Sequence, residues 1–300
     1  MMPMIQNQET TIRYITERRC ESGGYCFYRL DEPNAGDTFY ALASLAMMDA
    51  LPQDDEATQT YLHSFQRPDG SFPNVNVGHA VIRSLALLHE RPAINLSDWI
   101  LTAMTAPGDT TRPVESMSLF EPLFQLVNLC RLLKIPIPPR EKDVLIRAVL
   151  GYRRPDTGFG QSYSSMIETS HALAILAALD NETVAQPSIR FLHLCEDPDY
   201  GFLQVPNTRP PFLEHIHAGV LACSMIGYRS PVLEPCGDFI RKCFRENGGY
   251  VRSVFGGSAT LENTYLALDT FDMIEKMSKI PVQQTGCSHT PLVLSLRDDG

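Results

Sequence analysis

The sequence has no excess of positive charge and no long hydrophobic run. Its 25 Lys and Arg residues are outnumbered by 35 Asp and Glu, which gives a formal net charge of -10. Nucleic acids and anionic membranes bind clustered Lys and Arg, so this balance argues against both partners. No stretch approaches the roughly 20 apolar residues that span a membrane. The start of the chain also lacks the basic and apolar regions of a signal peptide. We therefore expect a cytoplasmic protein with no nucleic-acid partner and no membrane span.

Paired cysteines and alternating strand patterns are equally scarce. The eight cysteines lie at positions 20, 26, 130, 195, 223, 236, 243 and 287, and none forms a Cys-x-x-Cys pair. A globular chain of this length does not depend on disulfides, so we expect free thiols in a reducing compartment. Few segments alternate apolar and polar residues, which leaves little support for a β-sheet. With 44% hydrophobic and 20% charged residues, the composition is that of a folded helical protein.

A glycine followed by an aromatic residue recurs along the chain. The glycines are Gly24, Gly70, Gly158, Gly201 and Gly249. The intervals between them are forty-odd residues, except for the one between Gly70 and Gly158, which is twice as long. Dividing that interval in two gives five intervals of similar length. The missing turn is then expected near 107–109, which makes six units. A period of this length is typical of helical repeat proteins.

Each turn precedes a helical stretch with a shared pattern. An acidic residue is followed three positions later by an aromatic residue or histidine, and only the second unit, with Val77 and Ala80, departs from this. The pairs are Asp37 and Tyr40, Glu121 and Phe124, Glu168 and His171, Glu214 and His217, and Glu262 and Tyr265. An Ala/Leu-rich run such as 172–179 follows, and a helix that is apolar on all sides is buried.

A more polar helix completes each unit. Such segments are predicted at 58–66, 141–152, 188–195 and 236–245. Stacked pairs of a buried and an amphipathic helix form either an open solenoid or a closed ring, and the absence of a polar capping repeat favours closure. We therefore predict an all-α fold, an α/α toroid of about six helix pairs. It forms a single domain over residues 1–278, with a C-terminal tail at 279–300.

Two turns resemble a known repeat. The segments 66–72, Gln-Arg-Pro-Asp-Gly-Ser-Phe, and 154–160, Arg-Pro-Asp-Thr-Gly-Phe-Gly, are similar to the prenyltransferase/squalene-cyclase repeat, and the similarity spans roughly residues 10–275. The resemblance implies an inner ring of helices around a hydrophobic funnel, and an enzyme like the terpenoid cyclases or the protein prenyltransferase β-subunits. Its substrate would be a hydrophobic, isoprenoid-derived small molecule. The acids would lie in the first turn of the inner helices, where the helix dipole favours them, or would simply cap those helices.

The motifs of three relatives with this toroid are altered or missing. Against the zinc ligands of the prenyltransferase β-subunits, Glu214 aligns with the Asp, Ile216 with the Cys and Glu262 with the His. Pro211 replaces a diphosphate-binding Lys, for which Arg209 and Arg252 are the nearest substitutes. The Asp-x-Asp-Asp motif of terpene cyclases and the Cys-Gly-Glu-Gln thioester motif are absent. Aromatic residues that could line a cyclase cavity, such as Tyr25, are equally explained as packing at the turns.

Acid–base chemistry is the leading hypothesis for the site. Glu214, Glu262 and Glu168 are the predicted catalytic acids, assisted by His217, His171 and Tyr265. Carboxylates that converge in a dry funnel cannot all ionise, so one of them should keep its proton and act as an acid. The predicted substrate-binding residues, drawn from the same pattern and from the two arginines, are Asp37, Tyr40, Glu121, Phe124, Arg209 and Arg252.

Two alternatives stay open at this stage. Glu168 and His171, together with Glu214 and His217, form two Glu-x-x-His pairs, and Glu262 adds a carboxylate. This set of ligands suits a divalent Fe, Mn or Zn ion, although the histidines could simply occupy the aromatic position of the repeat. The second alternative is a non-catalytic toroid that binds a peptide or a lipid. A helical protein partner or a homo-oligomer is compatible with either.

Overall fold

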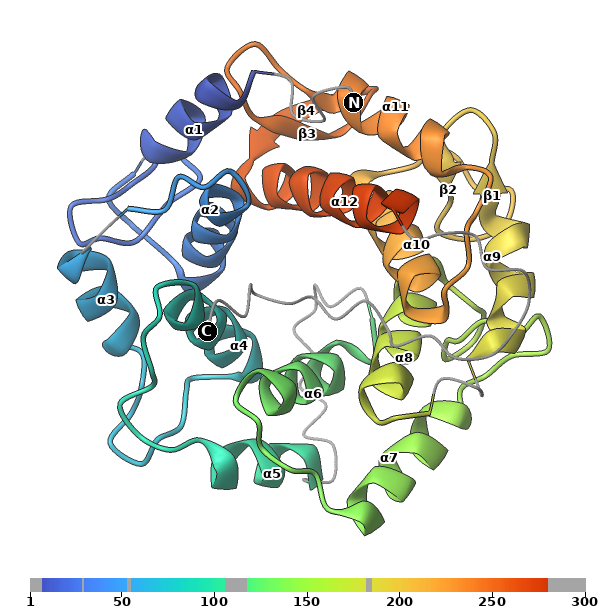
Figure 1. The fold of residues 1–300 in the computed structure, drawn as a ribbon, viewed down its shortest axis with the longest axis horizontal. Coiled ribbons are helices and arrows are strands. Elements are labelled where there is room, and N and C mark those ends of the chain that lie inside the picture. Colours follow the sequence, from blue (N-terminus) through green and yellow to red (C-terminus); the bar gives the residue numbers. More distant parts are fainter. Residues whose placement is uncertain (1–6, 29, 53–54, 106–117, 182–184, 280–300) are drawn as a thin grey trace. The chain divides into compact units, whose positions relative to one another are not determined.

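The computed structural model describes residues 7–28, 30–52, 55–105, 118–181 and 185–279. The turn predicted near 107–109 lies outside the described residues. So does the predicted tail, with Cys287 and His289, apart from its first residue, Lys279. The described residues form twelve α-helices and two small antiparallel sheets (Figure 1). The helices are α1 Gln8–Thr16, α2 Ala35–Met47, α3 Glu56–His63, α4 Val75–Leu87, α5 Ser97–Thr105, α6 Glu121–Leu132, α7 Pro139–Leu150, α8 Met166–Ala178, α9 Ile189–Cys195, α10 Leu213–Ile226, α11 Leu233–Cys243 and α12 Leu261–Lys279.

The chain divides into two compact units that are interleaved in sequence. Unit 1 comprises Met1–Val114, Gln125–Ile137 and Cys243–Leu268. Unit 2 comprises Glu115–Phe124, Pro138–Lys242 and Asp269–Gly300. The first residues of α12 therefore belong to unit 1 and the later ones to unit 2. The single domain predicted over 1–278 stays a prediction.

Each unit is built on two buried helices that pack side by side. These are α2 and α4 in unit 1, and α8 and α10 in unit 2 (Figure 1). The Ala/Leu-rich sequences of α8 and α10 are buried on nearly every side. In contrast, α7 buries only Val149. The predicted alternation of buried and more polar helices is therefore confirmed, and the ends of the polar helices agree within a few residues.

The glycine-aromatic repeat builds one recurrent turn. Each copy has five residues. The N–H of the first residue donates to the carbonyl of the fifth, and the N–H of the fourth donates to the carbonyl of the first. The fourth residue has a positive φ in every copy, which glycine adopts most easily. A Cβ on Gly248 would also overlap the backbone of Thr10. The copies are 20–24, 67–71, 154–158 and 245–249.

The aromatic residue after the turn is fixed by a threonine on the following helix. The N–H of Tyr25 donates to Thr38 Oγ1 at 3.0 Å, and that of Phe159 donates to Thr169 Oγ1 at 3.0 Å. The N–H of Tyr250 makes the same bond to a threonine of α12. All three aromatic side chains are fully buried. These aromatic residues therefore pack at the turns, which is one of the two explanations given for them in the sequence analysis.

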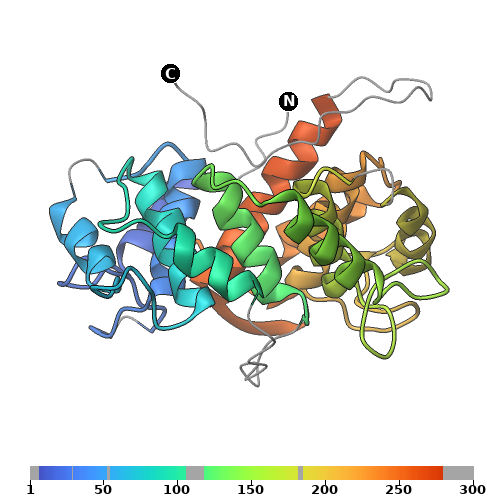
Figure 2. The ribbon, with the colours of Figure 1, turned by 90° about the horizontal axis from the view of Figure 1, so that it is seen from below.

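The two sheets are short hairpins. Strand β1, Glu196–Asp197, pairs with β2, Gly201–Phe202. Strand β3, Tyr250–Ser253, pairs with β4, Gly256–Thr260, with an irregular register after Val251. The second hairpin leads directly into the N-terminal end of α12 (Figure 2). Both hairpins are short and lie next to a glycine turn. They form no larger sheet among the described residues, so the fold is all-α in character.

Candidate functional site

Two of the predicted acids complete helix caps. Asn34 is the N-cap of α2 and accepts from the N–H of Asp37, whose Oδ2 accepts from the side chain of Asn34 at 2.8 Å and from the N–H of Phe27 at 3.0 Å. Ser165 caps α8 in the same way, and its hydroxyl donates to Glu168 Oε2 at 3.0 Å. The acid is the third helical residue in both, and it accepts from the side chain of the N-cap residue. Asp37 and Glu168 therefore organise the turn, and their expected substrate-binding and catalytic roles stay predictions.

Glutamine at position 168 should distinguish a cap from a catalytic acid. The side-chain oxygen of Gln can still accept from the Ser165 hydroxyl, so Glu168→Gln is expected to preserve both the unfolding free energy and any turnover. Glu168→Ala should lose about 0.5–1 kcal/mol, because the first turn of α8 loses its favourable acid. Denaturant unfolding measures the first effect and product formation the second. A Gln variant that folds normally but is inactive would contradict the capping role.

The other acids stand in a different register. Glu214 and Glu262 are the second residues of α10 and α12, and Glu121 is the first residue of α6. Glu262 is exposed, whereas Glu214 and Glu121 are half-buried. Thr260 accepts from the N–H of the third residue of α12, as Asn34 and Ser165 do in α2 and α8. Relative to the start of the helix, the acid is therefore shifted by one position in α10 and α12 and by two positions in α6.

In unit 2, the residue three positions after each acid joins a row across successive helices. Phe124 and His171 stack face to face, with ring centroids 4.6 Å apart and an interplanar angle of 6°. His217 lies close enough to His171 to lower its pKa. On its other side His217 contacts Asp269 of α12. Phe124, His171, His217 and Asp269 thus come from α6, α8, α10 and α12.

The row ends in a polar contact between His217 and Asp269. His217 Nε2 lies 2.7 Å from Asp269 Oδ2, and the exposed fractions of the two side chains are 17% and 8%. A buried carboxylate accepts a hydrogen bond from the imidazole N–H, so it fixes the tautomer with hydrogen on Nε2. Nδ1 is then the nitrogen that can take up or give a proton. This is the pairing of an oriented base and its orienting acid.

His171 stays neutral in the folded protein. Burial, with a smaller contribution from His217, lowers its pKa from 6.5 to about 3. Its Nδ1 is buried, and no hydrogen-bond partner for that atom is found among the described residues. The aromatic surface of the ring is used against Phe124. The interpretation of His171 as an occupant of the aromatic position agrees with this geometry.

Stability should therefore fall with acidification through His171. The unfolded chain binds a proton near pH 6.5 and the folded chain only near pH 3, so stability is lost as pH drops between these values. The slope attributable to one group reaches about 1.4 kcal/mol per pH unit. We expect His171→Phe, which keeps the stack on Phe124, to flatten that part of the profile. Urea unfolding of both proteins from pH 7 to pH 4 tests this, and identical slopes would contradict it.

Unit 1 holds a second cluster, on α2, α4 and α12. The rings of Tyr40 and Tyr265 have centroids 5.4 Å apart, and the Tyr40 hydroxyl donates to Glu262 Oε1 at 3.4 Å. Arg83 donates to the Tyr265 hydroxyl at 3.3 Å and places its guanidinium 4.0 Å from the centroid of the Phe39 ring. The structure therefore brings together three predicted residues, Tyr40, Glu262 and Tyr265, around an arginine.

The two predicted diphosphate-binding arginines lie elsewhere. Arg209 is 2.7 Å from Asp197 and 3.7 Å from Asp199, so carboxylates already surround it. It also lies over the ring of Tyr200. Arg252 is exposed on β3. Arg209 thus fastens the β1–β2 hairpin. The substrate-binding role expected of Arg209 and Arg252 stays a prediction.

The expected metal ligands do not assemble in the described part of the chain. Within it, no group of three or more His, Cys, Asp or Glu side chains lies in a position to hold a metal ion. Glu168 caps α8, His217 faces Asp269, and Ile216 at the position of the zinc-binding thiolate is a buried apolar side chain. These residues do not fit the zinc site of the prenyltransferases.

No described helix is long and apolar enough to cross a membrane.

The recurrent turns and paired helices decide the family. The model of the prenyltransferase alpha-alpha toroid domain matches residues 3–88 and 115–288. The chain belongs to this family. The fold class predicted from the repeat, an all-α toroid of helix pairs, is thereby confirmed, as is the resemblance at the turns.

Solved structures support the same fold. The chain is similar to Candida albicans protein geranylgeranyltransferase-I complexed with GGPP, with a TM-score of 0.68 and 14% identity. The similarity covers 90% of this chain and 91% of that one. No curated protein matches the sequence. Membership of the prenyltransferase toroid family indicates, at a coarse level, an isoprenoid-related enzyme or binding protein.

Sequence reasoning missed two residues of this toroid that the structure places at the centre of the clusters, Asp269 and Arg83. Each is a lone charged residue inside an apolar run, Ala267-Leu268-Asp269 and Val81-Ile82-Arg83. A charge in a buried helix must be paired or hydrogen-bonded. A single charged residue in an apolar helical run could therefore have identified both positions. Neither Asp269 nor Arg83 belongs to the acid-x-x-aromatic repeat from which the site was predicted.

Proposed function

We propose that this protein is an enzyme that acts on an isoprenoid-derived small molecule by acid–base chemistry at His217 and Asp269. The observation that carries the proposal is the 2.7 Å contact between His217 Nε2 and the buried Asp269 carboxylate. It replaces the carboxylates of the sequence hypothesis with a histidine, because Glu168 is engaged in a cap. Glu214, half-buried in the first turn of α10, remains a proposed assistant.

The chain's own residues define what this pair can do. Asp269 stabilises the imidazolium that forms when Nδ1 of His217 takes up a proton, and orients the ring in the neutral state. Phe124 and His171 extend the row as a flat, neutral surface against which an unsaturated hydrocarbon chain can pack. A proton can then be removed from, or returned to, a carbon or oxygen of the substrate. Terpenoid isomerases and cyclases need this step.

A proton-transfer assay in D₂O tests the proposal. The protein is incubated with farnesol, farnesyl diphosphate, GGPP and squalene, and products are analysed by mass spectrometry. We expect at least one of these probes to yield a new or recovered compound with deuterium bound to carbon, which does not exchange with D₂O without a catalyst. The absence of deuterium from all four probes after long incubation would count against acid–base chemistry on isoprenoids.

The remaining features expected from the sequence stay predictions. They are the cytoplasmic location and a helical protein partner or homo-oligomer. In unit 1, we propose that Tyr40, Tyr265 and Arg83 form an independent binding surface for an unsaturated or anionic group. Aromatic faces and a guanidinium both suit such ligands.

A further inference from the structure

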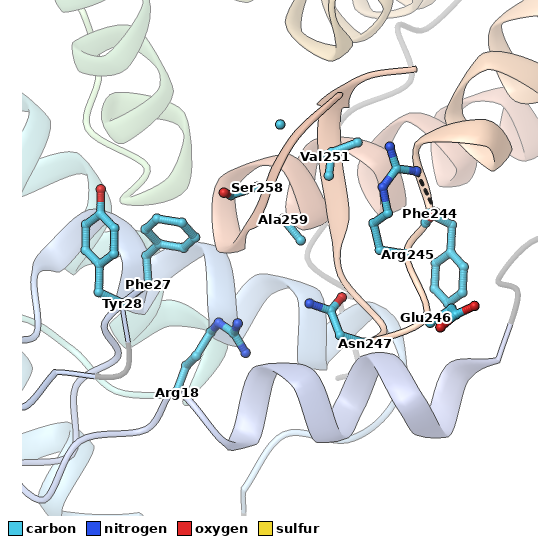
Figure 3. Close-up of a pocket in the computed structure, with 11 residues that line it drawn as sticks. Arg18, Phe27, Tyr28, Phe244, Arg245, Glu246, Asn247, Val251, Ser258 and Ala259 are labelled. Carbon is cyan, nitrogen blue, oxygen red and sulfur yellow. Dashed lines mark hydrogen bonds between the residues drawn. The ribbon is translucent and has the colours of Figure 1, made fainter. Parts of the chain in front are cut away.

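A pocket of about 730 Å³ lies in unit 1, beside the β3–β4 hairpin (Figure 3). Its volume is within the range of roughly 300–1,000 Å³ that small-molecule sites occupy. The lining comes from the segment after α1, the turn at 244–247 and strands β3 and β4. It shares no residue with the His217–Asp269 pair or with the cluster around Arg83, so it is a separate cavity.

Arg18 supplies a buried cation to this pocket. The residue is only 8% exposed. Its Nη1 donates to the carbonyl of Tyr14 at 2.6 Å, and its guanidinium carbon lies 3.5 Å from the centroid of the Tyr14 ring. These two contacts fix the plane of the guanidinium, which Figure 3 shows between Phe27 and Asn247. A pre-oriented guanidinium is the group that best matches the two oxygens of a carboxylate or phosphate.

The other charges leave the pocket attractive to an anion. Arg245 adds a second, half-buried cation, and its Nη1 donates to the carbonyl of Phe244 at 3.0 Å. Glu246 also lines the pocket but is exposed. Water screens an exposed charge, whereas a buried one acts in a lower dielectric. The field inside the pocket is therefore dominated by the arginines, even though the whole chain is acidic.

Aromatic side chains form the wall next to Arg18. The rings of Phe27 and Tyr28 have centroids 4.3 Å apart and are tilted by 56°. Tyr28 is 73% exposed, the largest exposed fraction among the big hydrophobic side chains described. Such a ring at the edge of a cavity offers a face on which a flat ligand can stack.

We propose that this pocket binds a small molecule in which an oxyanion is attached to a flat aromatic ring. The oxyanion, a carboxylate or a phosphate, lies on the guanidinium of Arg18, with Arg245 adding attraction. The ring packs against Phe27 and Tyr28. This binding site is independent of the proposed catalytic pair.

Isothermal titration calorimetry on the full chain tests the site. The probes are phenyl phosphate and benzoate, which differ in the oxyanion, and benzyl alcohol and inorganic phosphate, which each lack one half of the ligand. We expect at least one anionic aromatic probe to bind at least tenfold more tightly than either control. Arg18→Met, which keeps an unbranched side chain but removes the guanidinium, and Tyr28→Ala should each weaken that probe about tenfold. Arg147→Met, on the exposed side of α7, is the matched control and should change nothing.

Circular dichroism first establishes that each variant folds. If Arg18→Met does not fold, Arg245→Met takes its place, with the same expected direction. Equal affinity for benzyl alcohol and the anionic probes would overturn the guanidinium site. Inorganic phosphate that binds as tightly as phenyl phosphate would overturn the aromatic part. Failure of every probe to bind, or equal weakening by Arg147→Met, would overturn the proposal as a whole.

Discussion

Replacing Asp269 with asparagine is expected to reduce deuterium transfer to the isoprenoid product by about 10²-fold or more, in line with the usual contribution of general acid–base catalysis. The amide keeps the size of the carboxylate but carries no charge, so it cannot stabilise a protonated His217 across the 2.7 Å contact. Its NH₂ can also turn toward Nε2 and favour the wrong tautomer. We expect His217→Gln to cause a loss of similar size.

The double variant distinguishes a working pair from two separate contributions. If Asp269 acts through His217, then the two single losses should not multiply, and the double variant should be about as slow as His217→Gln alone. Asp272→Asn is the matched control, because Asp272 lies one turn further along α12 in a half-exposed ion pair with Lys276. An unchanged rate in Asp269→Asn would reject the proposed mechanism.

Replacing Gly219 with alanine should destabilise the protein by about 1–3 kcal/mol, the range found for overpacked cores. Gly219 lies in α10, where its missing side chain lets the helix approach the ring of Phe202. A Cβ built there overlaps that ring, and Phe202 is itself fully buried after the glycine turn. Either the ring or the helix must move, and α10 carries His217 two residues earlier. We therefore expect a loss of activity along with the loss of stability.

The chain offers a control of the same chemistry. Gly237 is also a buried helical glycine, in α11, but an added Cβ would meet its nearest atoms, in Arg241, at 3.5 Å, an ordinary contact. Gly237→Ala should therefore be neutral or stabilising by up to about 1 kcal/mol, because alanine favours the helix. Urea unfolding followed by circular dichroism compares the two. Equal effects at both positions would show that close approach to Phe202 is not the cause.

The sequence by itself determined the fold of this protein. A turn in which the fourth residue needs a positive φ, and in which a buried aromatic follows, restricts residue choice strongly at each repeat. Buried helices likewise need apolar residues on every side, which the run at 172–179 satisfies. Both constraints are local, so the pattern of helix pairs could be recognised without coordinates. The capping interpretation of the acids was also available, and it describes Asp37 and Glu168.

The tertiary structure alone decided which polar side chains meet. Glu168 and Glu214 occupy the same position in the sequence pattern but different positions in their helices, because α8 begins after a serine cap and α10 after Phe212. Asp269 is 52 residues from His217 in the chain, and no repeat links them. Such pairings depend on how helices from distant segments pack, and packing is set by many side chains at once. The repeat could therefore predict where the helices lie, but the pair at His217 emerged only from their contact.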